Sequence, residues 1–133
     1  MSNKLDKILA EISAGELIDK ITILEIKTKK IKDRIKAKEI KKEYVILKKK
    51  QNSSIKNNSN IKILFSSLKK INTTLWNVEG KLRIYEKNKN FNSKFIKLAR
   101  EVYFNNDHRS KIKLKINKLL GSNIREIKQY AKY

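Results

Sequence analysis

The densest group of polar side chains in this sequence is Asn106-Asp107-His108-Arg109. A histidine beside a carboxylate could serve as a general acid or base, and His108 is the only histidine in the chain. A lone histidine with one nearby carboxylate and no cysteine is weak evidence for catalysis or for a metal site. We therefore favour a structural interpretation, in which Asn106 or Asp107 caps a helix and the other two side chains are exposed.

A second group, Trp76, Glu79 and Arg83, would share one helical face, because residues three and four apart are neighbours on a helix. A tryptophan beside paired charges could form a recognition site. We favour a core role for the tryptophan and a surface ion pair worth less than ~1 kcal/mol. Gly80, in the middle of this helix, costs roughly 1 kcal/mol relative to alanine. It either allows another backbone to approach closely or has no special role.

Glu16, Asp19 and Lys20 form a third group, at the start of the first helix that the sequence predicts. Acidic side chains near a helix N-terminus are stabilised by the helix dipole, and Glu16–Lys20 is an ordinary i,i+4 pair. The sequence contains no glycine-rich phosphate loop, no HExxH motif and no serine–histidine–aspartate arrangement. We assign no catalytic residue, metal or cofactor, and we lean against an enzyme while an unrecognised activity stays open.

The element that would position the second group is an apolar pattern over residues 61–85. Its members alternate at spacings of three and four, which is an a/d seam that needs a partner helix. The seam residues are Ile61, Leu64, Leu68, Ile71, Leu75, Val78, Leu82 and Tyr85. This seam predicts a coiled-coil-like helix in a helical bundle.

The first helix should begin at Ser13, because Ser13 and Glu16 have capping-box spacing. We expect it to run to about Lys49, with its apolar stripe slipping round the helix partway along. Before the slip the stripe contains Leu17, Ile21, Leu24, Ile31 and Ile35, and after it Ile40, Tyr44 and Leu47. The polar segment 51–60 then predicts a flexible linker, so this helix and the seam helix would pack as an antiparallel hairpin.

The remaining segments complete a single domain over residues 1–133. Residues 1–12 look like a short amphipathic lead-in, with Leu5, Ile8, Leu9 and Ile12 on one side. A third helix should begin after Asn92 or Ser93 and break at 105–107, and a fourth should end at Gly121 before a tail at 122–133. We predict an all-α fold: a long antiparallel helical hairpin with one or two further helices packed at its base.

The formal net charge of +21 suggests a nucleic-acid partner. Two observations weaken that suggestion: the charge is spread evenly along the chain, and only five of the basic residues are arginine, the preferred phosphate reader. The abundance of lysine, asparagine and isoleucine also fits A/T-rich codons. No apolar run reaches the ~18 residues of a membrane span, and nothing resembles a signal peptide, so we expect a cytoplasmic protein.

Three segments, in order, resemble the motifs of a family of small bacterial and phage proteins of unknown function. The first is SAGELIDKITILEIK at 13–27, and the second is LWNVE at 75–79, which continues to Arg83. The third is FIKLAREVY at 95–103, followed by Asn106-Asp107, Arg109, Lys113, Ile116-Asn117 and Gly121-Ser122. The family is loosely associated with surface-polysaccharide gene neighbourhoods, and it brings no known activity with it.

The resemblance implies a candidate ligand- or partner-binding set drawn from all three segments. Its members are Glu16, Asp19, Lys20, Trp76, Glu79, Arg83, Arg100, Tyr103, Asn106, Asp107, Arg109, Lys113 and Asn117, with Gly15 beside them. Two departures matter. Gly80 stands where the family commonly has a second acid, which weakens a metal site, and His108 stands where a basic residue is usual.

We therefore expect a helical interaction or accessory protein, linked to surface-glycan biosynthesis through the resemblance. The alternative is a basic helical protein that binds RNA or DNA, and binding to an anionic membrane surface is a weaker candidate. Because the far end of a long hairpin would be thinly covered, we also expect a protein partner or a two-fold homodimer. A structure should show whether the candidate residues meet at one place.

Overall fold

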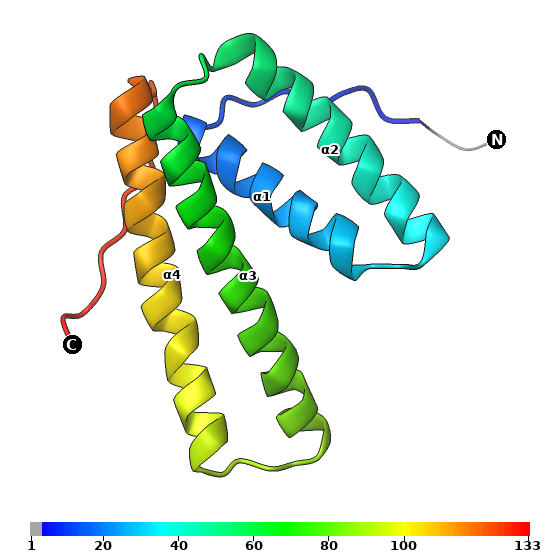
Figure 1. The fold of residues 1–133 in the computed structure, drawn as a ribbon, viewed down its shortest axis with the longest axis vertical. Coiled ribbons are helices and arrows are strands. Elements are labelled where there is room, and N and C mark those ends of the chain that lie inside the picture. Colours follow the sequence, from blue (N-terminus) through cyan, green and yellow to red (C-terminus); the bar gives the residue numbers. More distant parts are fainter. Residues whose placement is uncertain (1–3) are drawn as a thin grey trace.

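The computed structural model describes residues 4–133, which contain four helices: α1 (Ala14–Lys30), α2 (Arg34–Ser54), α3 (Ser59–Lys87) and α4 (Ser93–Leu120). α3 and α4 form a long antiparallel hairpin, α1 packs across its open end, and α2 folds back along α1 (Figure 1). The all-α fold and the long hairpin with two further helices at its base are confirmed. The members of that hairpin differ from those we expected.

The predicted single helix from Ser13 to about Lys49 is wrong, because the chain turns at residues 31–33. Ile31 is extended (φ −98°, ψ 120°), and the Asp33 side chain accepts a hydrogen bond from the Lys36 amide, which starts α2. The slip of the apolar stripe is the cause. Leu17, Ile21 and Leu24 of the first stripe lie on α1, and Ile40 and Leu47 of the second are half-buried on α2, which packs along α1. Ile31 lies in the turn and Ile35 is exposed on α2, so the first stripe does not continue past α1.

The seam of α3 is covered by α4 and by α1. Five of its residues are buried, and Leu64, Leu82 and Tyr85 are half-buried. The central core contains Ile18 of α1, Ile61, Leu68, Ile71 and Leu75 of α3, and Ile112 and Ile116 of α4. The seam partner is thus chiefly α4 rather than the first helix, and the first helix packs only on the part of α3 near the open end (Figure 1).

The helix break that we predicted at 105–107 is absent, because α4 runs unbroken from Ser93 to Leu120. Asn105 of this stretch donates to the Glu101 carbonyl at 2.7 Å, and the Asn106 side chain accepts a bond from Arg109 at 3.3 Å, both within α4. Asn106 and Asp107 therefore cap nothing. The real ends of α4 are as expected, with Asn92 as N-cap and Gly121 in the left-handed conformation (φ 63°).

The connections and ends are shorter or less helical than expected. α2 continues to Ser54 and α3 begins at Ser59, so the loop is residues 55–58 rather than 51–60. The described part of the lead-in, residues 4–12, forms no helix, and Leu5, Ile8 and Leu9 are exposed. Residues 1–3 of that lead-in lie outside the described part. Within residues 4–133, no helix is both long enough and apolar enough to cross a membrane.

Candidate functional site

Asp19 of α1 is a buried carboxylate, 1% exposed, at the junction of α1, α3 and α4. Arg109 of α4 donates to it twice, from Nε to Oδ1 at 2.9 Å and from a terminal nitrogen to Oδ2 at 2.5 Å. Asn72 of α3 donates to Oδ1 at 2.8 Å, and Lys113 Nζ lies 3.6 Å from Oδ2. Burial raises the pKa of this carboxyl, but the bonds from Arg109 and Asn72 and the two positive charges outweigh it, so the pKa falls below its ordinary value.

Lys113 of α4 extends the cluster toward solvent. Its Nζ lies 2.6 Å from Glu16 Oε2 on α1 and 3.5 Å from Glu126 Oε2 on the tail. Burial lowers the pKa of this amine, yet the bond to Glu16 and the neighbouring carboxylates raise it overall above its ordinary value. Arg109 also has a raised pKa, caused first by its bond to Asp19. Asp19, Arg109 and Lys113 are therefore all ionised at neutral pH.

The local sequence explains why these groups meet. Asn106, Arg109, Lys113 and Asn117 are spaced by three, four and four, so they line one face of α4. Glu16 and Asp19 share the facing side of α1 in the same way. The helix break that we expected at 105–107 would have left Asn106 outside the helix of the other three, and the continuous α4 keeps all four on one face.

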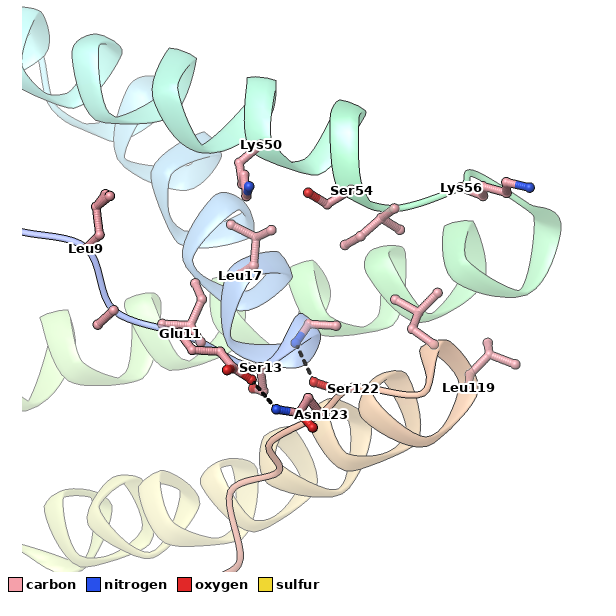
Figure 2. Close-up of a pocket in the computed structure, with 15 residues that line it drawn as sticks. Leu9, Glu11, Ser13, Leu17, Lys50, Ser54, Lys56, Leu119, Ser122 and Asn123 are labelled. Atoms are coloured by element: carbon pink, nitrogen blue, oxygen red, sulfur yellow. Dashed lines mark hydrogen bonds between the residues drawn. The ribbon is translucent and has the colours of Figure 1, made fainter.

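The N-terminus of α1 is hydrogen-bonded to the C-terminal end of α4 and to a residue just beyond it. The Gly15 amide donates to Asn117 Oδ1 at 2.6 Å, and the Ala14 amide donates to Ser122 Oγ at 3.1 Å. These bonds satisfy amides that the first turn of a helix leaves free. Figure 2 shows Ser122 beside this end of α1, with Asn123 bonded to Glu11 of the lead-in. A Cβ on Gly15 would lie 2.6 Å from the Lys113 carbonyl oxygen, so the close approach requires glycine.

A groove of about 230 Å³ lies beside this cluster, between α1, α3 and α4. Its lining comes from three helices: Ile23 and Ile26 of α1; Asn72, Leu75, Trp76 and Glu79 of α3; and Asn106 and Arg109 of α4. Trp76 is half-buried and Glu79 is exposed. Two groups that the sequence suggested separately, around Trp76 and around Arg109, thus share one groove.

Five of the candidate residues lie outside the cluster and do not line the groove. Lys20 is exposed and lies 3.8 Å from Glu16, and Arg83 is exposed and pairs only with Glu79 at 3.7 Å. Arg100, Tyr103 and Asp107 lie along α4: Arg100 stands over the Phe104 ring, Tyr103 packs against Phe104 and Tyr133, and Asp107 accepts a hydrogen bond from the Tyr133 hydroxyl. His108 is exposed.

Asn72 and Thr22 belong to the cluster and were missed from the sequence. Asn72 Nδ2 donates to Thr22 Oγ1 at 2.8 Å as well as to Asp19, and both residues are buried. The available signal was position: Asn72 follows Ile71 in the seam, where a polar residue needs a polar partner. In the described residues, no buried side-chain nitrogen or oxygen lacks a hydrogen-bond partner.

The hydrogen bonds and ion pairs of the cluster hold α1, α3 and α4 together. Both oxygens of Asp19 are engaged, so the carboxylate is poorly placed to take a proton from a substrate. Within residues 4–133, no three histidine, cysteine or acidic side chains are grouped as metal ligands. A larger open hollow of about 990 Å³ lies between the lead-in and the ends of α2 and α4, but none of the candidate residues lines it (Figure 2). We place the candidate site at the smaller groove because four candidate residues line it, whereas a hollow of about 750 Å³ between α4 and the tail is lined by one, Asp107.

Fold and site together define a class: a four-helix, all-α protein whose two hairpins are joined by a buried ion-pair cluster beside a shallow groove. Comparison with protein families then assigns the chain. It belongs to a family of unknown function, DUF6165, whose sequence profile matches residues 8–133. Comparison with curated proteins and with solved structures finds no significant match.

Proposed function

We propose that this protein is a non-enzymatic helical interaction module, and that the groove beside Trp76 is where its protein partner binds. The observation that carries the proposal is the position of Trp76, half-buried at the edge of a groove that also contains Ile23 and the exposed carboxylate of Glu79. Tryptophan beside apolar and charged neighbours is the composition typical of interface hot spots.

The size of the groove favours a protein side chain over a free small molecule. Pockets for small-molecule ligands usually have volumes of ≈300–1,000 Å³, whereas this groove measures about 230 Å³. One or two side chains of a partner would fill it. Glu79 would favour a partner residue that is basic, next to an apolar residue that packs on the Trp76 ring.

The ion-pair cluster supports binding by holding the walls of the groove in place. Arg109 lines the groove and is at the same time fixed by Asp19, and Asn72 is fixed by the same carboxylate. A first layer of contacts held by a second layer of hydrogen bonds is the arrangement that preorganised binding sites need. Full engagement of Asp19 also supports a binding role over catalysis.

The partner that we propose is a protein of surface-glycan biosynthesis. This part of the proposal is supported only by the resemblance of the three sequence motifs, and it is an accessory role rather than a reaction. Purified protein should therefore turn over no nucleotide-sugar. Turnover that disappears in the Asp107→Ala variant would contradict a non-enzymatic function.

Site-specific photocrosslinking in cells tests the binding groove. A photoreactive phenylalanine in place of Trp76 should give one dominant protein adduct, and the Glu79→Lys substitution should reduce it. The control is the same photoreactive residue in place of Ile63, which is exposed on α3 but does not line the groove. Equal adducts from both positions, or none from the groove position, would contradict the proposal.

A further inference from the structure

The basic charge is even along the sequence at the scale of forty or fifty residues, but it is uneven over shorter segments within the first fifty residues. Residues 4–26 contain three lysines and five acidic residues, whereas residues 27–50 contain twelve lysines or arginines and three acidic residues. This second segment is the end of α1, the turn, and almost all of α2. The α1–α2 hairpin therefore has a strongly basic tip and outer helix.

The acidic side chains of α1 are paired with other elements, so they do not neutralise this surface, and with Asp33, Glu39 and Glu43 counted residues 27–50 keep an excess of nine basic side chains. Asp19 and Glu16 pair with α4, and Glu25 pairs with Lys69 of α3 at 2.8 Å. Asp33 caps the start of α2. In the described residues, none of the twelve basic side chains between 27 and 50 forms an ion pair.

α2 presents these charges on an open face. It has no buried residue, and its half-buried positions Ile40, Tyr44 and Leu47 lie toward α1. Helical periodicity places Lys38, Lys42 and Lys49 on the opposite side, where all three are exposed. Figure 1 shows α2 at the outside of the molecule, with α1 between it and the α3–α4 hairpin. At 1.5 Å per residue this face is on the order of 30 Å long.

We propose that the outer face of α2 and the adjoining turn bind the sugar–phosphate backbone of double-stranded nucleic acid without reading its sequence. Exposed lysines along one helix face match a row of phosphates, which is the electrostatic basis of sequence-independent binding. This surface goes beyond the proposed function, because it is separate from the groove at Trp76.

Two other polyanions fit the surface less well. Binding to a single strand usually adds aromatic rings that stack on bases, and the only aromatic residue of α2, Tyr44, faces α1 and contacts Glu25. Insertion into an anionic membrane needs a continuous apolar stripe. The exposed Ile35 and Ile46 are separated along the same face by Lys42, so α2 has no such stripe.

Fluorescence anisotropy with a labelled 20-base-pair DNA duplex, from about 50 to 200 mM salt, tests the proposal. The test variant is Lys38→Glu/Lys42→Glu/Lys49→Glu. Its matched control, Lys81→Glu/Lys94→Glu/Lys97→Glu, makes the same charge change at exposed lysines near the closed end of the α3–α4 hairpin. We expect the α2 triple variant to lose at least about tenfold in affinity and roughly two to three units of salt slope, and the control far less.

Two further variants separate a loss of binding from a loss of folding, and this proposal from the proposed function. Replacing the same three lysines by glutamine should give a weaker loss of the same kind with unchanged helical circular dichroism, which separates binding from folding. Trp76→Ala should leave duplex affinity unchanged, so this proposal and the proposed function fail separately. The proposal would be overturned by equal losses of affinity in the two glutamate triple variants, or by no duplex binding near about 50 mM salt. It would also be overturned by tighter binding to a single strand than to the duplex, or by binding to anionic lipid vesicles without binding to the duplex.

Discussion

Arg109 and Asp19, ninety residues apart in sequence, are joined by two hydrogen bonds at 2.9 and 2.5 Å. The pair connects α4 to α1, and so it connects the α3–α4 hairpin to the α1–α2 hairpin. Because the Asp19 carboxylate is buried and the guanidinium is largely covered, the pair is tied to the folded state far more strongly than a surface ion pair is.

Replacing Asp19 by asparagine should therefore destabilise the protein by about 3 kcal/mol, because it leaves Arg109 as a partly buried positive charge without its carboxylate, whereas Lys113 keeps Glu16 and Glu126. Urea denaturation followed by circular dichroism measures the change in the free energy of unfolding. The control is Arg83→Gln, which removes an exposed i,i+4 pair and should cost less than ~1 kcal/mol. Equal effects of the two substitutions would contradict a structural role for the buried pair.

The same carboxylate should make the free energy of unfolding decrease as the pH falls in the acidic range. The folded-state pKa of Asp19 is lowered from its ordinary value of 3.8, so the unfolded chain binds the proton more readily. Its contribution to stability is complete above that value and is lost as the pH falls through the lower, folded-state pKa. Chemical denaturation between about pH 5 and 2 should show a steeper decline for the native sequence than for Asp19→Asn. Parallel curves would show that Asp19 is not the titrating group.

Two glycines should respond in opposite directions to alanine. At Gly15 a Cβ would lie 2.6 Å from the Lys113 carbonyl oxygen, so α1 and α4 must separate, at a cost of about 1–3 kcal/mol. At Gly80 a Cβ would meet no atom within 4 Å, so alanine should stabilise the helix by about 0.5–1 kcal/mol. Thermal unfolding of both variants measures the two changes. A stabilising Gly15→Ala would contradict the close helix contact.

Patterns local to one helix predicted the parts of the fold that depend on local interactions. Ser13 caps α1 by accepting a hydrogen bond from the Glu16 amide, Asn92 caps α4 in the same way, and Gly121 ends it. The seam of α3 was visible because its spacing repeats over more than three heptads. Each of these features is encoded within a few residues of the atoms that it satisfies.

The features that the sequence did not reveal depend on tertiary contacts. The turn at residues 31–33 has no proline or glycine, and only the shifted stripe marked it. The polar run at 105–107 favours a turn, but packing of Ile112 and Ile116 in the core keeps α4 continuous. Asp19 was missed as a cluster centre because the helix dipole already explained an acid there, and nothing local points to Arg109.

Self-association should use the closed end of the α3–α4 hairpin rather than the hairpin for which we expected it, because the first helix and the seam helix do not form one. Here Ile84 and Ile96 are 61% and 57% exposed, near Phe91 in the connecting loop, which is 52% exposed. Sedimentation equilibrium at tens of micromolar should show a dimer that Ile84→Lys/Ile96→Lys weakens, because a charge there opposes apolar contact. The control is Ile63→Lys, which is equally exposed elsewhere on α3. A monomer at these concentrations would exclude the dimer.

The C-terminal tyrosine should titrate abnormally, because the tail lies against α4. The Tyr133 hydroxyl donates to the Asp107 carboxylate, and its ring packs on Tyr103 and Phe104 at centroid distances of 5.4 and 5.1 Å. The bond to Asp107, which only the neutral phenol can donate, raises the pKa of Tyr133 to about 12. At pH 11 it should thus be roughly one-tenth ionised, whereas an ordinary tyrosine would be about nine-tenths ionised.

Difference absorbance of tyrosinate between the native protein and Tyr133→Phe isolates this one group from the other four tyrosines. In the Asp107→Asn background the same difference should shift toward the ordinary pKa of about 10, because the acceptor loses its charge. Glu101→Gln removes an acid from α4 that does not contact Tyr133, and it should leave the titration unchanged. A Tyr133 that titrates near the ordinary pKa of about 10 in the native protein would mean that its hydroxyl is not held against Asp107 of α4.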